Sequence, residues 1–410
     1  MKNWQKKKLG ELSKKKDDVV SGPFGSNLKV SDYKNEGIPI LRLQNIGKGY
    51  FIDKDIKFIT ETKAEELKYH SFLSGDIALA KLGIPIGKTC IIPTYLKSGI
   101  ITADIVRIRP DKNVVDYNFL EYYLNTDISV RQLTGNISGA TRPRVNLSDV
   151  RNIEIFLPAL PEQQRIVSIL DQTFAAIDKA KENAQSNLQN AKELFESYLQ
   201  GVIEKKGVGW EEERFNLVCE LNPQKKEARH KLKETDMVTF LPMEDLGILN
   251  KDIIGIKERQ LKDVSGSYTY FADNDVLMAK ITPCFENGKI GIARNLINGI
   301  GFGSSEYIVF RSKGYVEPDY LYYFLSRNQI RSIGSKLMSG AVGHKRVSKD
   351  WIDNYIIHFP TSIKEQKNLV SKLDALSAET KRLEAIYHQK LLDLEELKKS
   401  VLQKAFNGEL

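Results

Sequence analysis

Two stretches of the chain, residues 157–200 and 359–403, carry apolar or small side chains at alternating steps of three and four residues. In the first stretch and just beyond it these positions are Ile166, Leu170, Thr173, Ile177, Ala180, Ala184, Asn187 or Leu188, Ala191, Leu194, Tyr198 and Val202. In the second stretch they are Leu373, Leu376, Thr380, Leu383, Tyr387, Leu391, Leu394, Leu397 and Val401. Such steps form the narrow apolar seam of a coiled coil, so each stretch is predicted to be one long helix.

The residues at the start of the first stretch are typical of a helix N-terminus. Pro158 and Pro161 end the preceding chain, and Glu162 places a negative charge in the first turn. No further proline or glycine follows until Gly201. At a rise of 1.5 Å per residue, about forty residues would span about 60 Å.

The second stretch repeats the first. Glu162 and Gln163 match Glu365 and Gln366, and each pair lies 203 residues apart. The same offset holds at the far end of the two stretches, which indicates a duplicated element. Each helix could pack against its own domain only. The alternative that we favour is that the two seams face each other as an antiparallel pair that sets a distance.

The segments before the two helices read as mixed α/β globules. In the first globule, residues 38–43, 75–81 and 99–110 alternate or run apolar as strands do, and residues 117–133 look helical. The second globule repeats this order with an offset that drifts between 199 and 202. The predicted fold class is therefore α+β, with two duplicated globules at residues 1–157 and 207–360 and helical segments at residues 158–206 and 361–410.

Composition adds limits to this picture. Of the 410 residues, 41% are hydrophobic and 28% are charged, as in soluble globular proteins, and no apolar run is long enough to span a bilayer. The three cysteines are too few and too scattered for a disulfide framework, so we expect a reducing cytoplasm and no membrane. A formal charge of +8 permits binding to a polyanion.

Paired lysines recur beside a buried strand in both globules. The first copy resembles a phosphate loop, but only three residues separate Gly83 from Gly87, where a P-loop needs four. The alternatives are solvated lysines at a tight turn or cations that contact phosphates, which position a nucleic acid without specifying it. The lysines are Lys81, Lys88, Lys280 and Lys289.

Gly/Ser-rich loops near the end of each globule also carry cations. Long cations suit groove edges and phosphates, and arginine can bind guanine through two hydrogen bonds. Surface charge without a partner is the alternative, but recurrence at the same place in both globules argues against it. The residues are Arg142 and Arg144 in the first copy and His344, Lys345 and Arg346 in the second.

No catalytic or metal-binding constellation emerges, so we expect a non-catalytic protein without cofactor or metal. The five histidines lack metal spacing, and neither G-x-S-x-G nor H-E-x-x-H occurs. The sequence from Asn222 to Lys225 does not match the Asn-Pro-Pro-aromatic motif of amino-methyltransferases.

Several strings resemble the specificity subunit of type I restriction-modification systems. They are LPALPEQQRIV from Leu157, LQKAFNGEL from Leu402, GPFGS from Gly22 and MAKITPCFENGK from Met278. Together they extend the resemblance over the whole chain. Within these blocks and the adjoining turn, the resemblance implies DNA contacts for Gly22, Phe24, Ser26, Lys29 and Asn287.

The family resemblance implies that each globule reads half of a split double-stranded DNA sequence. The helices would hold the halves at a fixed spacing and dock two methyltransferase subunits, which use S-adenosylmethionine to methylate adenine N6, and a restriction (translocase) subunit would join them. The helix residues expected to serve partner binding are Glu162, Gln163, Arg165, Ile166, Leu170, Ile177, Leu373, Leu376, Leu383 and Leu394. A stand-alone DNA-modifying enzyme and a scaffold for protein partners only are the rival hypotheses.

Overall fold

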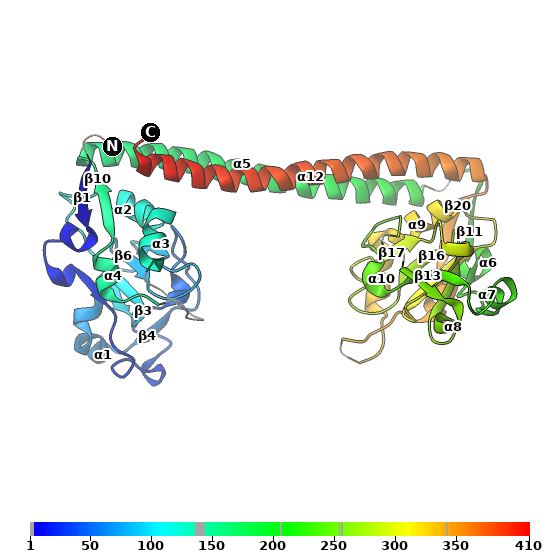
Figure 1. Ribbon diagram of the computed structural model, residues 1–410, viewed down its shortest axis with the longest axis horizontal. Coiled ribbons are helices and arrows are strands. Elements are labelled where there is room, and N and C mark those ends of the chain that lie inside the picture. The colour runs from blue at the N-terminus through cyan, green and yellow to red at the C-terminus, as the bar shows by residue number, and fades with distance from the viewer. Residues whose placement is uncertain (1–3, 136–143, 206, 254, 256, 342) are drawn as a thin grey trace. The chain divides into compact units, whose positions relative to one another are not determined.

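The computed structural model describes residues 4–135, 144–205, 207–253, 255, 257–341 and 343–410. The chain divides into two compact units. Unit 1 comprises residues 1–184 and 390–410, and unit 2 comprises residues 185–389. Each unit therefore contains one globule and a part of each long helix (Figure 1).

The globule of unit 1 is built on three small sheets. A four-stranded sheet has the order β2 (Val19–Ser21), β9 (Ile105–Ile108), β6 (Ile77–Ala80), β7 (Thr89–Ile91), with all neighbours antiparallel. A second has the order β4 (Lys57–Ile59), β3 (Ile38–Leu41), β8 (Ser98–Ile101), β5 (Ser71–Leu73), where β3 and β8 are parallel. The third pairs β1 (Gln5–Lys8) with β10 (Glu154–Leu157).

Unit 2 repeats this topology sheet for sheet. Its sheets have the orders β12 (Cys219–Leu221), β19 (Tyr307–Ser312), β16 (Val276–Ala279), β17 (Ile290–Ile292); β14 (Lys257–Gln260), β13 (Met237–Leu241), β18 (Ile300–Gly303), β15 (Thr269–Ala272); and β11 (Trp210–Arg214), β20 (Ile356–Pro360). A parallel pair is again present in the second sheet, between β13 and β18. The mixed α/β class and the internal duplication are therefore confirmed.

Short helices cover the sheets. Unit 1 has α1 (Glu61–Glu66), α2 (Tyr117–Leu124), α3 (Asp127–Thr134) and α4 (Leu147–Arg151). Unit 2 has α6 (Phe215–Val218), α7 (Lys226–Lys231), α8 (Leu261–Val264), α9 (Pro318–Ser326), α10 (Asn328–Lys336) and α11 (Lys349–Asn354). Short 3-10 turns are η1 (Leu9–Leu12), η2 (Lys16–Asp18), η3 (Val30–Asp32), η4 (Leu43–Asn45), η5 (Lys68–His70), η6 (Met243–Asp245) and η7 (Ile297–Gly299).

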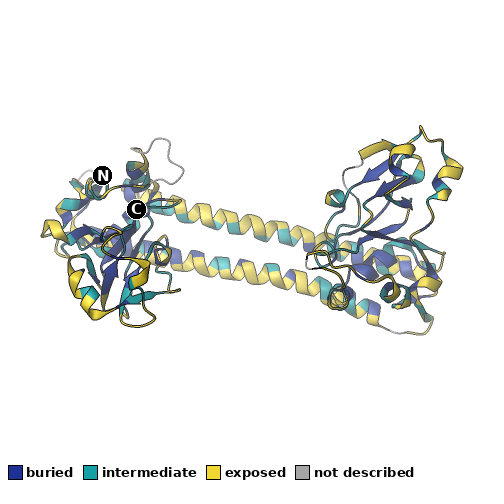
Figure 2. Cartoon of the chain, turned by 90° about the horizontal axis from the view of Figure 1, so that it is seen from below, coloured by how far each residue is buried: buried dark blue, intermediate teal, exposed yellow. Residues whose placement is uncertain are grey.

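The two predicted long helices are present as α5 (Leu160–Glu204) and α12 (Ile363–Asn407). In unit 1 they run antiparallel. Asp178 on α5 lies 3.2 Å from Lys398 on α12, and Lys181, further along α5, pairs at 2.5 Å with the earlier Glu395. Figure 2 shows exposed faces along both helices and buried strands within each globule.

Two details of the predicted helical segments differ. The helix expected over residues 117–133 is two helices, because the hydroxyl of Thr126 accepts a hydrogen bond from the Ser129 amide and caps a new start. Near the end of α5 the buried positions are Leu199 and Ile203, whereas the predicted seam residues Leu194 and Tyr198 are exposed. A 3.6-residue helix drifts relative to a strict 3.5-residue repeat, and here the seam shifts by one position.

The strand expected over residues 99–110 is also two strands, β8 and β9, which belong to different sheets. A turn separates them, in which the amide of Ile105 donates to the carbonyl of Thr102 at 3.0 Å. This turn moves the chain from one sheet to the next and places Asp104 at a sheet edge.

Buried apolar residues of α5 and α12 join the core of each unit. In unit 1, Ile166 and Leu170 on α5 and Phe406 on α12 pack with the globule. In unit 2, Ile203 on α5 and Leu373 on α12 do the same. Each globule core is therefore completed by both helices.

A candidate nucleic-acid interface

One edge of the β2-β9-β6-β7 sheet gathers several of the residues that the sequence singles out in unit 1. Because β9 is antiparallel to β2 and β6, the ends of β2 and β6 meet the start of β9, with Ser21 opposite Val106 and Ala80 opposite Ile105. The loops of residues 22–28 and 81–87 leave from this edge. We call it the loop edge of unit 1.

Lys81 lies at the centre of this edge. Its side chain is mostly buried, and its ammonium group donates to the hydroxyl of Ser21. Burial and the nearby Arg144 guanidinium lower the pKa of Lys81, while the Asp104 carboxylate opposes that shift. The backbone amide of Lys81 donates to the carbonyl of Asp104 at 2.8 Å.

Arg144 completes the arrangement. Its guanidinium lies 2.6 Å from the Asp104 carboxylate, and its backbone forms a β-bridge with Leu82, the residue after Lys81. A lysine, an acid and an arginine from three separate chain segments thus meet at one edge. Lys81, Asp104 and Arg144 form the cation cluster of unit 1.

The loop edge of unit 2 carries the same cluster. The amide of Lys280 donates to the carbonyl of Glu306 at 2.9 Å, and its ammonium group donates to the carbonyl of Ser305 at 2.8 Å. Arg346 donates two hydrogen bonds to the Glu306 carboxylate, at 2.9 and 2.7 Å, and they raise the pKa of Arg346 and lower that of Glu306. Lys280, Glu306 and Arg346 form the cation cluster of unit 2.

The backbone around the two clusters also matches. Val145 donates to the carbonyl of Lys81 at 3.0 Å, and Val347 donates to the carbonyl of Lys280 at 2.9 Å. The two arginines are half-exposed at the same place, so both clusters present a planar cation to the surface. The pairing of these arginines with Asp104 and Glu306 was missed in the sequence, although both acids occur at matching positions of the repeat.

The remaining residues expected to contact DNA lie in different settings. Gly22 packs against the backbone, because a Cβ atom there would lie 2.1 Å from the carbonyl oxygen of Thr102. Lys289 donates to the carbonyl of Met243 at 2.6 Å, so its ammonium group is engaged within unit 2. Arg142 lies outside the described residues, Lys88 is half-exposed, and the exposed members are Phe24, Ser26, Lys29, Asn287, His344 and Lys345.

Several helix residues expected to bind partners face their own unit instead. The fully buried amide of Gln163 donates to the carbonyls of Val114 and Pro158 and accepts from the amide of Asp116. This burial assigns Gln163 to the attachment of α5 to its globule rather than to a docking surface. The same correction applies to the buried side chains of Ile166, Leu170, Ile177 and Leu373.

Gln366 repeats the arrangement of Gln163 in unit 2. It donates to the carbonyls of Tyr315 and Pro360 and accepts from the amide of Glu317. The fixed offset of the repeat is the sequence signal that could have identified this role. Of the other helix candidates, Arg165 is exposed, whereas Glu162, Leu376, Leu383 and Leu394 are partly buried.

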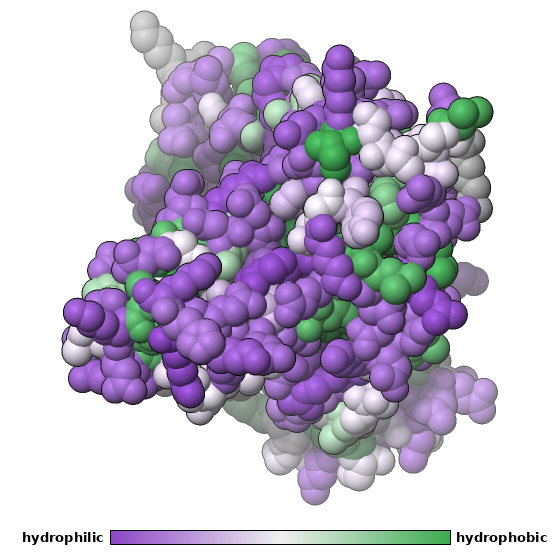
Figure 3. All heavy atoms as spheres, turned by 90° about the vertical axis from the view of Figure 1, so that its right-hand side faces the viewer, coloured by the Kyte–Doolittle hydropathy of each residue, from purple (hydrophilic) through white to green (hydrophobic). Residues whose placement is uncertain are grey.

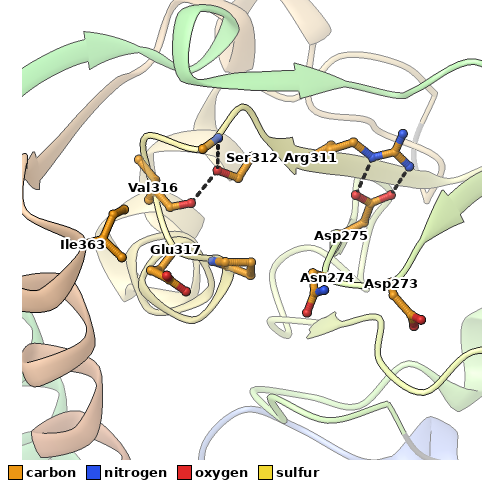
Figure 4. Close-up of a pocket in the computed structure, with 10 residues that line it drawn as sticks. Asp273, Asn274, Asp275, Arg311, Ser312, Val316, Glu317 and Ile363 are labelled. Carbon is orange, nitrogen blue, oxygen red and sulfur yellow. Dashed lines mark hydrogen bonds and ion pairs between the residues drawn. The ribbon is translucent and has the colours of Figure 1, made fainter. Parts of the chain in front are cut away.

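A cavity of about 260 Å³ lies in unit 2 between β19 and the start of α12 (Figure 4). Its carboxylate from Asp275 accepts two hydrogen bonds from Arg311, at 2.8 and 2.7 Å. The hydroxyl of Ser312 is bonded to the carbonyl of Val316. These side chains stabilise the fold, and neither arrangement activates a nucleophile.

Within the described ranges, no cluster of histidine, cysteine, aspartate or glutamate residues has the geometry of a metal site. No described helix combines the length and the apolar character needed to cross a bilayer. The face of unit 2 turned to the viewer in Figure 3 is mainly hydrophilic, with small apolar groups between the polar side chains.

The two globules share one topology, carry matching cation clusters at equivalent places and are each completed by residues of both long helices. Comparison with known proteins identifies the family of the chain. Residues 1–186 and 207–391 match the family described as the type I restriction modification DNA specificity domain. The chain belongs to this family.

Relatives of known name are consistent with this membership. The chain is 33% identical over 178 residues to the EcoAI specificity subunit of Escherichia coli, covering 43% of this chain and 29% of that protein. In its matches to the EcoAI and EcoEI subunits, the chain therefore spans less than a third of their length. The putative MjaX specificity subunit of Methanocaldococcus jannaschii matches end to end, at 23% identity over 100% of this chain and 96% of that one.

Solved structures share the fold. A chain from a type I restriction-modification complex has a TM-score of 0.75 at 20% identity and covers 100% of this chain and 98% of its own. The HsdS subunit from Thermoanaerobacter tengcongensis has a TM-score of 0.60 at 19% identity, with 100% and 97% covered.

Proposed function

We propose that this chain is the DNA-reading subunit of a type I restriction-modification complex. Each globule reads one half of a bipartite double-stranded target through its loop edge. The observation that carries the proposal is the recurrence of one lysine, acid and arginine cluster at the same edge of both globules. A cluster kept in both copies, while the loops around it differ, fits a shared task performed on two different sequences.

The chemistry of the cluster suits DNA. A lysine at this edge adds positive charge that attracts the phosphates and so helps to position the duplex. Arg144 and Arg346 each carry a planar fork that can bind guanine O6 and N7. Asp104 and Glu306 orient the forks before DNA arrives, and the carboxylates give up this pairing when a base or a phosphate takes their place.

The helices supply a frame and a docking surface in this proposal. Leu194 and Leu397 lie 203 residues apart at matching positions of the repeat, and their side chains are 62% and 47% exposed. Exposed leucines at equivalent places on α5 and α12 are suited to two copies of one partner. We assign them to the two methyltransferase subunits, which use S-adenosylmethionine to methylate adenine N6, with restriction subunits joining the complex.

The proposal divides the chain into recognition globules at residues 1–157 and 207–360 and helical spacers at residues 158–206 and 361–410. Catalysis belongs to the partner subunits. The rival reading, a scaffold for protein partners alone, gives the two cation clusters no task and predicts that the complex binds all DNA sequences equally.

The test compares Arg144→Ala with Arg346→Ala in the chain assembled with its methyltransferase subunits. Methylated adenines are mapped across a genome for each variant. Arg144→Ala is expected to relax one half of the target and Arg346→Ala the other, each with a loss of about 1–3 kcal/mol on the affected half-site. Relaxation of the same half by both variants, or of neither, would refute independent reading by two globules.

A further inference from the structure

The loop edge of unit 1 displays two apolar side chains that are almost fully exposed. Phe24 is 84% exposed and Ile84 is 82% exposed. Both lie in the loops that leave the ends of β2 and β6, beside the cation cluster. Single exposed apolar side chains are common, but two at the edge assigned to a ligand indicate a contact surface.

The backbone holds both side chains in place. Pro23 is buried, and the amide of Asn27 donates to the carbonyl of Phe24 at 2.8 Å, which closes a tight turn. The loop that carries Ile84 is closed by the amide of Gly87, which donates to the carbonyl of Ala80 at 3.0 Å. The two side chains are therefore presented outward by short, hydrogen-bonded loops.

Unit 2 has polar residues at the matching positions. Gln224 follows β12 as Phe24 follows β2, and each comes directly after a buried proline. Thr282 follows Lys280 in the loop where Ile84 follows Lys81, and each directly precedes a proline. The hydroxyl of Thr282 donates to the Glu286 carboxylate at 2.7 Å. Gln224 is exposed, whereas Thr282 is partly buried and engaged within its loop. The duplication thus kept the frame of the edge and replaced two exposed apolar side chains by polar ones.

We propose that Phe24 and Ile84 read thymine in the half-site of unit 1, through apolar contact with its C5-methyl group in the major groove. This inference rests on the proposed function. Thymine alone among the four bases presents a methyl group there, so an apolar side chain can distinguish it without a hydrogen bond. Lys81 and Arg144 hold the duplex at the same edge, which brings the bases within reach of both loops.

The test removes the methyl group instead of the base. In duplexes that contain the mapped target, each thymine of the unit 1 half-site is replaced singly by deoxyuridine, and binding to the assembled methyltransferase complex is measured. Burying one methyl group corresponds to about a fourfold change in affinity. For the unaltered complex, we expect about a fourfold loss of affinity when deoxyuridine replaces thymine at one or two positions. For the complexes with Phe24→Ala or Ile84→Ala, we expect no loss of affinity on the same replacement.

Tyr95→Ala is the matched control. Tyr95 is an exposed aromatic residue of the same globule that follows the end of β7, away from the loop edge. This variant is expected to keep the full penalty for deoxyuridine. The variants should also leave the response to deoxyuridine in the half-site of unit 2 unchanged.

The possible outcomes distinguish a failure of the thymine contact from a failure of the proposed DNA-reading function. A complex that binds its target specifically but tolerates deoxyuridine at every position would overturn the reading of thymine and leave the proposed function standing. A half-site of unit 1 that contains no thymine would do the same. A complex without preference for its target over scrambled DNA would overturn the proposed function, and the inference with it.

Discussion

The replacement of Phe406 by alanine tests whether the C-terminal turn of α12 belongs to the core of unit 1. The Phe406 side chain is 1% exposed, and its ring centroid lies 5.1 Å from that of Phe119 and 5.2 Å from that of Tyr123, with edge-to-face geometry in both pairs. Both partners come from α2, more than 280 residues earlier in the chain. The contact therefore closes the unit through residues that are distant in sequence.

The expected loss is large. Truncation of a buried phenylalanine to alanine costs about 3–5 kcal/mol, and this includes the two aromatic contacts. A domain is stable by only about 5–15 kcal/mol, so the change removes a large share of the stability of unit 1. The open population of unit 1 should rise between about a hundredfold and a few thousandfold.

Amide hydrogen exchange, read peptide by peptide, is the appropriate assay. Phe406→Ala should lower protection in α2 of unit 1, while α9 of unit 2 serves as an internal reference. Ile203 is the matching position on α5, fully buried in unit 2, so Ile203→Ala should lower protection in α9 instead. Leu397→Ala, at a 47% exposed position of α12, is the control and should change neither region.

Two results would refute this reasoning. If Phe406→Ala leaves exchange in α2 unchanged, the C-terminal turn does not hold the first globule. If Phe406→Ala and Ile203→Ala reduce protection in both units alike, the units do not have separate cores.

Four further predictions concern DNA, spacing, acidity and catalysis. Lys81→Ala and Lys280→Ala should weaken DNA binding about equally on all sequences. They should also reduce the slope of the logarithm of the binding constant against the logarithm of the salt concentration by about one, as measured by titration at several salt concentrations. A loss of affinity confined to cognate DNA would contradict a phosphate role. Four residues inserted after Ala184 and four after Gln389 lengthen each helix by about 6 Å and just over one turn. The mapped methylation sites should then keep both half-sequences and gain about two base pairs of spacer, at about 3.4 Å per pair. An active variant with an unchanged spacer would show that the helices do not set the distance. Burial raises the pKa of the Glu121 carboxyl to about 8 in the folded state, whereas its pKa in the unfolded chain is about 4.3. The protonated carboxyl therefore contributes up to a few kcal/mol to stability below the unfolded pKa, and this contribution is lost as pH rises through about 8. Glu121→Gln should flatten the dependence of Tm on pH, and an unaltered profile would contradict the assignment. The isolated chain should transfer no methyl group from S-adenosylmethionine to DNA, and labelled DNA after incubation with the chain alone would contradict a non-catalytic role.

The long helices and the duplication could be predicted from the sequence because they depend on local and periodic information. A seam repeated every three or four residues determines a helix and its apolar face, and Pro158 with Glu162 determines where it begins. The offset of 203 residues between Gln163 and Gln366 shows that two stretches share a structure, whatever that structure is. The strands around Ile77 and Val276 were found in the same way, since buried strands carry continuous apolar runs.

The roles of individual side chains were decided by tertiary structure. In the sequence, Gln163 is one polar residue of a helix. In the structure it is fully buried, and because a buried amide must pair with nearby backbone groups, it attaches α5 to its globule.

The candidate site shows the same division. The positions of Lys81 and Arg144 could be read from the repeat, but their meeting at Asp104 depends on the order of the strands, which places three distant segments at one edge. Sheet order follows from contacts between residues far apart in the chain, and no local pattern encodes such contacts.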